Sequence, residues 1–352
     1  MFVAALDPYY LGLTAIITVG WQAIGFAIAY GLQIDTITDF WSAINFFALA
    51  LITLLFGDSF YARNIISSIF VMLWAVRLGA WQLFRMLKMG GDSRFDEMRA
   101  KPLKFAQFWI AQALWVWTVS TPVVVLNSPA VSRALDGYGG TDYPFATAKD
   151  IIGIIFWLLG FACEAFADLQ KYTFKQSKPP RGAITDTGLW HYSRRPNYFG
   201  EILLWLGIYL LVISPASSST ISRRGHDALL ATVISPLFTF MLLMFLSGLP
   251  LSEKPSQEKS FLKSHGYASK DRNQEALPPF RQQTQGDHWE RYKAFRSRTS
   301  LLIPIPPAIY QPLPRWIKCS ILCDWPMYNF DEKRDGPKAL QADEKKQQDQ
   351  SA

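Results

Sequence analysis

Cysteine, histidine and charge are all scarce in this chain of 352 residues. Three cysteines cannot build a disulfide framework, and they cannot supply all four ligands of a thiolate zinc site. The four histidines have no metal-type spacing, so we expect the protein to bind no metal. Charged residues make up 18% of the chain, against about 25% in ordinary soluble domains. The scarcity of charge points away from a soluble fold.

Apolar residues, by contrast, make up half of the chain and gather in long runs. A transmembrane helix needs about 20 mainly apolar residues. Seven runs meet this requirement or approach it, near residues 9–30, 37–56, 64–87, 106–127, 150–170, 197–214 and 228–250. The sequence therefore predicts an all-α polytopic membrane bundle of about seven transmembrane helices. The first run follows a segment without basic residues, so we expect a retained anchor and not a cleaved signal peptide.

The net charge of +7 is carried largely by loops that flank the apolar runs. Basic residues concentrate in residues 88–104 and 171–195, and such loops lie on the cytosolic side of membranes. With seven spans the C-terminal part would also be cytosolic. We interpret the charge as a topology signal and expect no nucleic-acid partner, with the endoplasmic reticulum as the expected membrane.

Hydrophobicity divides the chain into three parts. We expect residues 1–250 to form the transmembrane bundle and residues 251–330 to form a cytosolic segment. Within that segment, residues 288–300 suit a short helix, the Pro-rich stretch 302–314 excludes a regular helix, and residues 316–325 suit the membrane surface. Residues 331–352 mix charge with glutamine and have little apolar content, which predicts disorder.

A dense polar and aromatic cluster, residues 189–201 (LWHYSRRPNYFGE), leads directly into the sixth apolar run. Arg194 and Arg195 precede Pro196, a residue that suits the first turn of a helix. Positive charge at a helix N-terminus is a natural seat for a phosphate. The alternative is an interfacial girdle of basic and aromatic residues, but Asn197, Tyr198 and Glu201 follow within about one turn and favour a binding site.

Two other apolar runs carry ionisable residues. Glu164, Asp168 and Lys171 share one helix face at the end of the fifth run, and Arg77 lies inside the third. Charge within a membrane is costly and often functional. An ion pair between Asp168 and Lys171, or a structural partner for Arg77, is the alternative.

Several segments together resemble a known family. Residues 186–201 (DTGLWHYSRRPNYFGE) closely resemble the motif of the DUF1295 membrane proteins, which are relatives of the steroid 5-alpha-reductase C-terminal domain. Sterol C14 and C24 reductases and isoprenylcysteine methyltransferases are more distant relatives. Further similar segments follow in order at residues 38–40, 74–79, 91–96, 164–171, 247–251 and 292–300.

The resemblance implies a membrane reductase that passes a hydride from NADPH to a carbon–carbon double bond of an apolar substrate, such as a sterol-like enone. It implies cofactor contacts by Asp168, Lys171, Arg194, Asn197, Tyr198, Glu201, Tyr292 and Arg298. Arg195 stands where the family usually has histidine, so an imidazole role is lost while a cationic contact to phosphate remains. Residues 253–286 also form a longer segment than in bacterial members. We consider Glu164, Asp58 and Tyr61 as candidate catalytic groups on the substrate side.

Two other functions stay open on the sequence. The isoprenylcysteine enzymes share the general arginine-rich segment, so an S-adenosylmethionine-dependent methyltransferase is one alternative. A non-catalytic lipid-binding membrane protein with a vestigial cofactor site is the other, and Arg195 is the feature that favours it.

Overall fold

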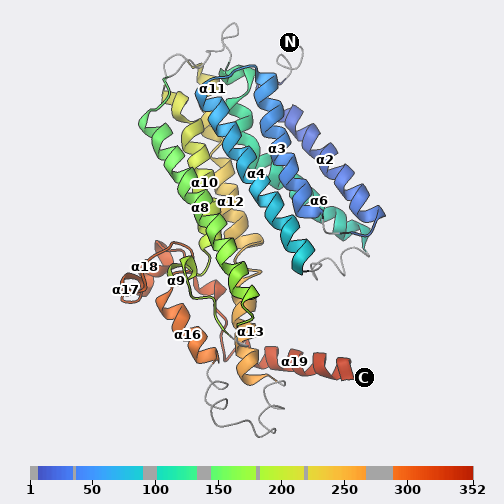
Figure 1. Cartoon of the computed structure of the whole chain (residues 1–352), viewed down its shortest axis with the longest axis vertical. Coiled ribbons are helices and arrows are strands. Elements are labelled where there is room, and N and C mark those ends of the chain that lie inside the picture. The colour runs from blue at the N-terminus through green and yellow to red at the C-terminus, as the bar shows by residue number, and fades with distance from the viewer. Residues whose placement is uncertain are drawn as a thin grey trace. The chain divides into compact units, whose positions relative to one another are not determined.

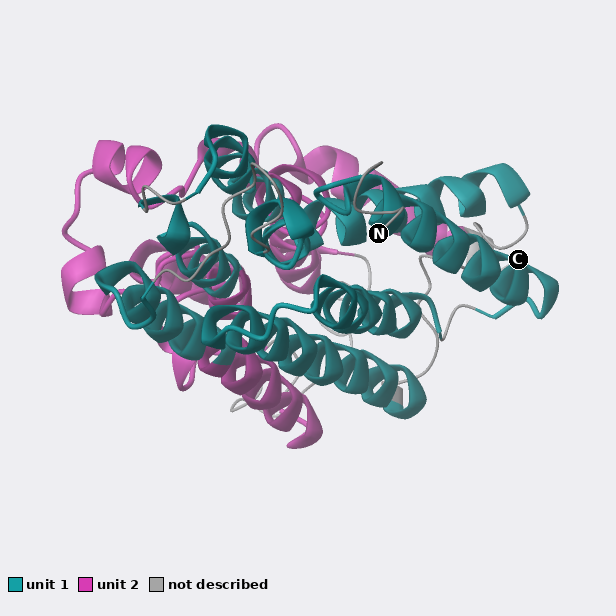
Figure 2. Cartoon of the chain, turned by 90° about the horizontal axis from the view of Figure 1, so that it is seen from above, with its two compact units in different colours: residues 1–161, 202–240 teal, residues 162–201, 241–352 magenta. Residues whose placement is uncertain are grey.

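The computed structural model describes residues 7–34, 37–89, 101–132, 144–179, 183–217, 221–266 and 288–351. Within these ranges the chain folds into helices and contains no β-strand; an isolated bridge joins Ser193 and Ser300. The chain divides into two compact units, coloured separately in Figure 2. Unit 1 comprises residues 1–161 and 202–240, and unit 2 comprises residues 162–201 and 241–352.

The long apolar helices confirm the predicted membrane bundle. Six helical stretches of the described chain are long and apolar enough to cross a membrane. They comprise α2 (Leu11–Gly31), α3 (Thr38–Gly57), α4 (Ala62–Met89), α6 with α7 (Pro102–Leu126, Pro129–Ser132), α8 (Ala148–Gln176), and α11 with α12 and a π-helical turn (Arg223–Ala231, Ile234–Met241, Leu242–Leu246). The sixth predicted run forms α10 (Pro196–Val212), which is apolar but only 17 residues long. The protein is therefore a polytopic integral membrane protein.

Four of these helices pack side by side in unit 1. Helix α3 packs against α4 and α6, and α2 packs against α6 (Figure 1). Phe46 of α3 lies at the centre of an aromatic cluster, with ring centroids 5.1 Å from Trp74, 4.9 Å from Trp115 and 6.0 Å from Trp205. The contacts with Trp74 and Trp115 are edge-to-face, and such aromatic pairs add to the energy of apolar burial. They fix how the helices of unit 1 pack.

Buried amide side chains complete the hydrogen bonds at the end of α6. The Asn64 amide donates to the Leu126 carbonyl (3.2 Å) and to Ser132 Oγ (2.9 Å). The Asn127 amide donates to Ser68 Oγ at 3.0 Å. In a bilayer such backbone groups find no water, so internal partners are required.

A proline inside α6 is accommodated locally. Pro122 has no N–H to donate to the Thr118 carbonyl, four residues earlier. The Thr121 hydroxyl donates to that carbonyl instead, at 2.8 Å. The carbonyl therefore keeps a partner within the apolar helix.

Glycines allow α8 and the later part of α10 to approach closely in unit 1. A Cβ on Gly207 would lie 2.6 Å from the Gly153 carbonyl oxygen and 2.6 Å from the Trp157 nitrogen. Small residues let membrane helices meet backbone to backbone, and Gly207 serves this purpose on α10.

Unit 2 has a smaller core of its own. Helices α13 (Glu253–His265), α16 (His288–Arg298) and α19 (Gly336–Ser351) pack around Phe261, Trp289, Phe330 and Ala339. Short helices complete the unit: α9 (Leu189–Tyr192), α17 (Pro307–Tyr310) and α18 (Arg315–Ser320). Helix α16 confirms the short helix predicted for residues 288–300. The single turn of α17 is consistent with the Pro-rich sequence.

Two helices of unit 2 were not predicted from the sequence. The sequence of α13 has little apolar periodicity, because its buried residues are Glu253, Gln257 and Phe261, two of which are polar. Helix α19 occupies the tail for which the sequence predicted disorder. Ala339 and the partly buried Leu340 pack it against the unit 2 core, and two such residues leave little signal in the composition of the tail. The compact units also differ from the expected division at residue 250, because residues 162–201 belong with the C-terminal part.

Candidate functional site

The Arg-Arg segment of unit 2 is held by its backbone. The Arg194 N–H donates to the Ser300 carbonyl at 2.8 Å, beside the Ser193–Ser300 bridge. The Ser193 hydroxyl donates to the Leu302 carbonyl at 2.8 Å and accepts from the Arg195 N–H at 3.0 Å. Both arginines therefore leave a fixed stretch of chain immediately before α10 begins at Pro196.

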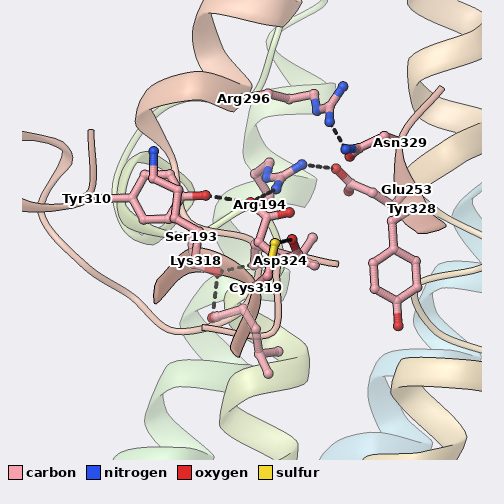
Figure 3. A network of polar contacts seen from close by, with 12 residues as sticks. Ser193, Arg194, Glu253, Arg296, Tyr310, Lys318, Cys319, Asp324, Tyr328 and Asn329 are labelled. Carbon is pink, nitrogen blue, oxygen red and sulfur yellow. Dashed lines mark hydrogen bonds and ion pairs between the residues drawn. The ribbon is translucent and has the colours of Figure 1, made fainter. Parts of the chain in front are cut away.

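Their guanidinium groups enter a buried cluster of opposite charges. Arg194 donates from Nη1 to Glu253 and from Nη2 to Asp324 Oδ2 (2.8 Å), while Arg195 Nη2 lies 3.2 Å from Glu253 Oε2. Figure 3 shows Arg194 between Glu253 and Asp324, with Tyr310 donating its hydroxyl to Asp324. The side chains of Arg194 and Glu253 are 3% and 1% exposed. Such a pair is held by mutual charge, because each group has lost its water.

Protonation follows from this arrangement. Burial alone raises the pKa of Glu253, but the charges of Arg194, Arg195 and Arg296 outweigh it and hold that pKa below its usual value. Burial lowers the pKa of Arg194, and the carboxylates of Glu253 and Asp324 more than reverse that effect. The cluster is therefore ionised, with Glu253 as a carboxylate at neutral pH.

A second network fixes the segment before the arginines. Asp186 accepts from Arg298 Nη2 through one oxygen, and its other oxygen lies 3.0 Å from His191 Nδ1. Two bonds come from α8: the Gln170 side chain accepts from the Leu189 N–H (2.9 Å), and the Ala167 carbonyl accepts from Trp190 Nε1 (2.9 Å). Gly188 has φ +59° against the Gln170 side chain, a conformation that suits glycine.

A cavity of about 210 Å³ lies in unit 2 beside these networks. Its basic lining residues are Lys171, Arg194, Arg195, Lys259 and Lys263, and its acidic one is Glu253. Five positive charges against one negative charge leave a formal excess of four. Tyr292 also lines the cavity; burial and then the Glu253 carboxylate raise its pKa to about 12, so it keeps its proton. Lys171 Nζ stands 4.5 Å from the centre of the Trp190 ring, another lining residue.

The structure brings together four of the predicted cofactor contacts, namely Lys171, Arg194, Arg195 and Tyr292. The others lie elsewhere in unit 2 and do not line this cavity. Asp168 is partly buried on α8, while Asn197, Tyr198 and Glu201 lie in the first turns of α10. Arg298 is engaged by Asp186. The buried Asn197 Oδ1 has no hydrogen-bond partner among the described residues.

The candidate catalytic residues are divided between the units. Glu164 is buried on the part of α8 that belongs to unit 2. Asp58 and Tyr61 are exposed in the turn between α3 and α4 of unit 1. Arg63, two residues after Tyr61, pairs at 2.8 Å with Asp150, and Glu164 follows Asp150 about four helical turns further along α8. Neither unit by itself brings the three residues together, and their catalytic role stays a prediction.

Sequence reasoning missed the acidic partners and the lysines of α13. A buried pair of arginines requires carboxylates, which points to the acidic residues of the C-terminal segment. Glu253 is the first of these, two residues after the family-like residues 247–251. Asp324 lies about 130 residues from Arg194 and had no comparable signal. Lys259 and Lys263 lie in a hydrophilic stretch, where nothing in the sequence distinguishes them from its other charged residues.

The fold and this site define a class: a polytopic helical membrane protein with a basic, partly buried cavity formed outside its apolar runs. The family model described as a protein of unknown function (DUF1295) matches residues 25–273. This match covers well over half of the chain, and the chain belongs to the DUF1295 family. No curated protein and no solved structure matches it.

Proposed function

We propose that the protein is an integral membrane oxidoreductase that transfers a hydride from NADPH to a carbon–carbon double bond of a lipophilic, sterol-like or other enone substrate. The observation that carries the proposal is the formal excess of four positive charges around the unit 2 cavity. A phosphate-rich cofactor is the partner that such a cavity favours. The family resemblance of residues 186–201 supplies the reaction.

The same charge weighs against a methyltransferase. S-adenosylmethionine carries a positively charged sulfonium and no phosphate, so a strongly basic cavity repels the part of the ligand that reacts. NADPH carries a diphosphate and a further phosphate group, and each gains from nearby ammonium or guanidinium donors. Electrostatics therefore supports the nucleotide.

The size of the cavity limits what it would hold. At about 210 Å³ it is smaller than the roughly 300–1,000 Å³ of common small-molecule pockets. We expect it to receive a phosphate-bearing portion of the cofactor and not the whole dinucleotide. Lys171 and Arg195 would contact that portion, while Tyr292, protonated at neutral pH, would donate a hydrogen bond.

Bound NADPH would supply the hydride to the β carbon of the enone and would itself be oxidised to NADP⁺. A protein acid must then deliver a proton to the α carbon, and a donor must polarise the carbonyl. Glu164, Asp58 and Tyr61 are the candidates for these roles. An apolar surrounding suits the reaction because it admits a lipophilic substrate and excludes water.

The proposal includes a location. The basic loops predict that residues 171–195 and the C-terminal segment face the cytosol, where NADPH is available. The endoplasmic reticulum is the proposed membrane, in keeping with the resemblance to sterol reductases.

Binding tests the proposal first. Purified protein in nanodiscs should bind NADPH more tightly than S-adenosylmethionine by calorimetry. The Lys171→Ala variant should weaken NADPH binding about 10-fold or more, the value expected for a lost charge-assisted hydrogen bond. Lys175→Ala is the matched control, since Lys175 is exposed one turn later on α8 and does not line the cavity.

Chemistry tests it second. Membranes containing the protein, incubated with a lipid extract and NADPH, should yield products heavier by two hydrogens in mass spectrometry. Tighter binding of S-adenosylmethionine than of NADPH would contradict the proposal. Binding of neither, with no turnover, would favour the non-catalytic alternative.

A further inference from the structure

One face of α13 carries four polar side chains that line the cavity: Ser256, Lys259, Ser260 and Lys263. Their spacing of i, i+3, i+4 and i+7 places them on the same side of the helix. We call these four residues the α13 stripe. The residues of α13 that are buried in unit 2 are Glu253, Gln257 and Phe261, so the stripe is not part of the core contact.

The two lysines of the stripe differ from the arginines in their partners. Arg194 and Arg195 are already paired with Glu253, and Arg194 also with Asp324. Within the described ranges, no carboxylate lies within ion-pair distance of Lys259 or Lys263. Partial burial and the neighbouring Lys259 charge lower the pKa of Lys263, as expected for crowded positive charges. The uncompensated charge of the cavity therefore includes the stripe.

The stripe also supplies hydroxyl groups. The side chain of Ser260 makes no hydrogen bond to another residue of the described chain, whereas the Ser256 hydroxyl donates to the Ser252 carbonyl of its own helix. Two ammonium groups one turn apart, with a hydroxyl group beside them, offer donors to several oxygens of one anion.

The charge selects the kind of anion. A phosphate monoester carries about two negative charges at neutral pH and has three terminal oxygens. One such group neutralises both lysines and relieves their repulsion at i, i+4, whereas each phosphodiester group carries a single charge. We propose that the α13 stripe is a binding subsite for a phosphate monoester. Its assignment to the 2′-phosphate of NADPH rests on the proposed function; the headgroup of phosphatidic acid is the other source of the same chemistry.

Paired ligands that differ by one monoester test the subsite. Affinities of the protein in phosphatidylcholine nanodiscs would be measured for NADPH against NADH and for 2′-AMP against adenosine. A further arm compares nanodiscs with and without phosphatidic acid. The variant is Lys259→Ala with Lys263→Ala, and its control is Lys345→Ala with Lys346→Ala on α19, where both lysines are exposed and away from the cavity.

The double variant should bind NADPH and 2′-AMP about 10- to 100-fold more weakly, as expected for lost charge-assisted contacts. The affinity for NADH should change less than about 2-fold. The control variant should keep its affinity for every ligand. If the Lys259→Ala, Lys263→Ala double variant unfolds, Lys259→Gln with Lys263→Gln should show the same loss of affinity. Loss of a preference for phosphatidic acid, with 2′-AMP unbound throughout, supports the subsite and assigns it to lipid.

Two results overturn the subsite. In one, the double variant keeps its preference for NADPH over NADH and for phosphatidic acid; in the other, it loses affinity equally for both dinucleotides. An unchanged preference leaves the proposed function intact if NADPH still binds and is consumed. Binding of 2′-AMP that depends on the stripe, without binding of either dinucleotide, has the reverse meaning: the subsite stands and the proposed reductase function fails.

Discussion

Arg194 and Arg195 are adjacent, yet their charges have different uses. Arg194 is bound by two carboxylates and is almost fully buried, so its charge serves the structure of unit 2. Among the described residues, Arg195 makes one ion pair, from its Nη2 to Glu253. Arg195 also lines the cavity. The sequence predicted a binding role for the pair but could not distinguish the two residues, because the distinction depends on Asp324 and Glu253 from distant parts of the chain.

Removing the charge of Glu253 should destabilise the protein. The Glu253→Gln variant keeps the shape of the side chain but leaves the buried Arg194 and Arg195 without their shared carboxylate. Breaking a buried pair in this way costs about 3–5 kcal/mol. Thermal unfolding in detergent measures it, with Glu258→Gln on the same helix as the control, since Glu258 makes no ion pair in the described structure. Equal stability of both variants would contradict the structural role of Glu253.

The same residue gives a pH dependence with a definite sign. The folded protein holds the pKa of Glu253 below its ordinary value of 4.5. Its stabilising contribution is therefore complete above pH 4.5 and is lost as the pH falls below that value through the lowered pKa. The difference in unfolding temperature between the wild type and Glu253→Gln should be constant near neutral pH and should shrink in acid. A difference that grows in acid would show the opposite linkage.

At the scale of elements, the length and hydrophobicity of the apolar runs predicted the long helices of unit 1 well, because both are requirements of the bilayer. The same signal is missing for α13 and α19, whose contacts with the rest of unit 2 involve few apolar residues. On α13 the buried Gln257 donates to the Tyr328 carbonyl and accepts from the Phe330 N–H, both at 2.8 Å. A polar residue that bonds to two backbone groups leaves no hydrophobic signal in the sequence.

The contact between α8 and α10 should not tolerate a methyl group. In Gly207→Ala the new Cβ would meet the Gly153 carbonyl at 2.6 Å, a backbone atom that cannot turn away. Overpacking of this kind costs about 1–3 kcal/mol. Gly20→Ala on α2 is the control, since nothing lies within 4 Å of its added Cβ, and it should be neutral or stabilising. Thermal unfolding of both variants decides the matter; a harmless Gly207→Ala would argue against the close approach.

For the segment around α18, a place at the membrane surface stays a prediction, and its exposed side chains suit it. Trp316 and Ile321 are 66% and 60% exposed, beside the basic Arg315 and Lys318. Exposed apolar side chains with basic neighbours suit the headgroup region. Brominated lipids should quench part of the protein's fluorescence, and Trp316→Phe should remove some of that part. Trp190→Phe, at a buried position, should not; quenching unaffected by Trp316→Phe would place the residue in water.

For the whole molecule, the number of times that the chain crosses the membrane depends on α10. Six stretches of the described chain meet the length and apolarity of a span, and α10 has 17 residues, about 26 Å of helix rise against a hydrocarbon core of about 30 Å. An odd number of crossings puts the two ends of the chain on opposite sides, and an even number puts them on the same side. Basic residues precede α10 at Arg194 and Arg195, which favours a crossing there, whereas Arg223 and Arg224 after it favour the reverse.

Tags on the two ends would resolve this conflict. We predict seven crossings, because α10 is apolar along its length and its later part packs backbone to backbone with α8 at Gly207 and Gly153. In sealed microsomes a C-terminal tag should be digested by added protease, and an N-terminal glycosylation tag should be modified in the lumen. Both ends on the same side of the membrane, with the two tags either digested together or protected together, would mean that α10 does not cross. Residues 171–195 and the C-terminal part would then be separated by a single crossing, which the ion pairs of Arg194 with Glu253 and Asp324 in unit 2 oppose.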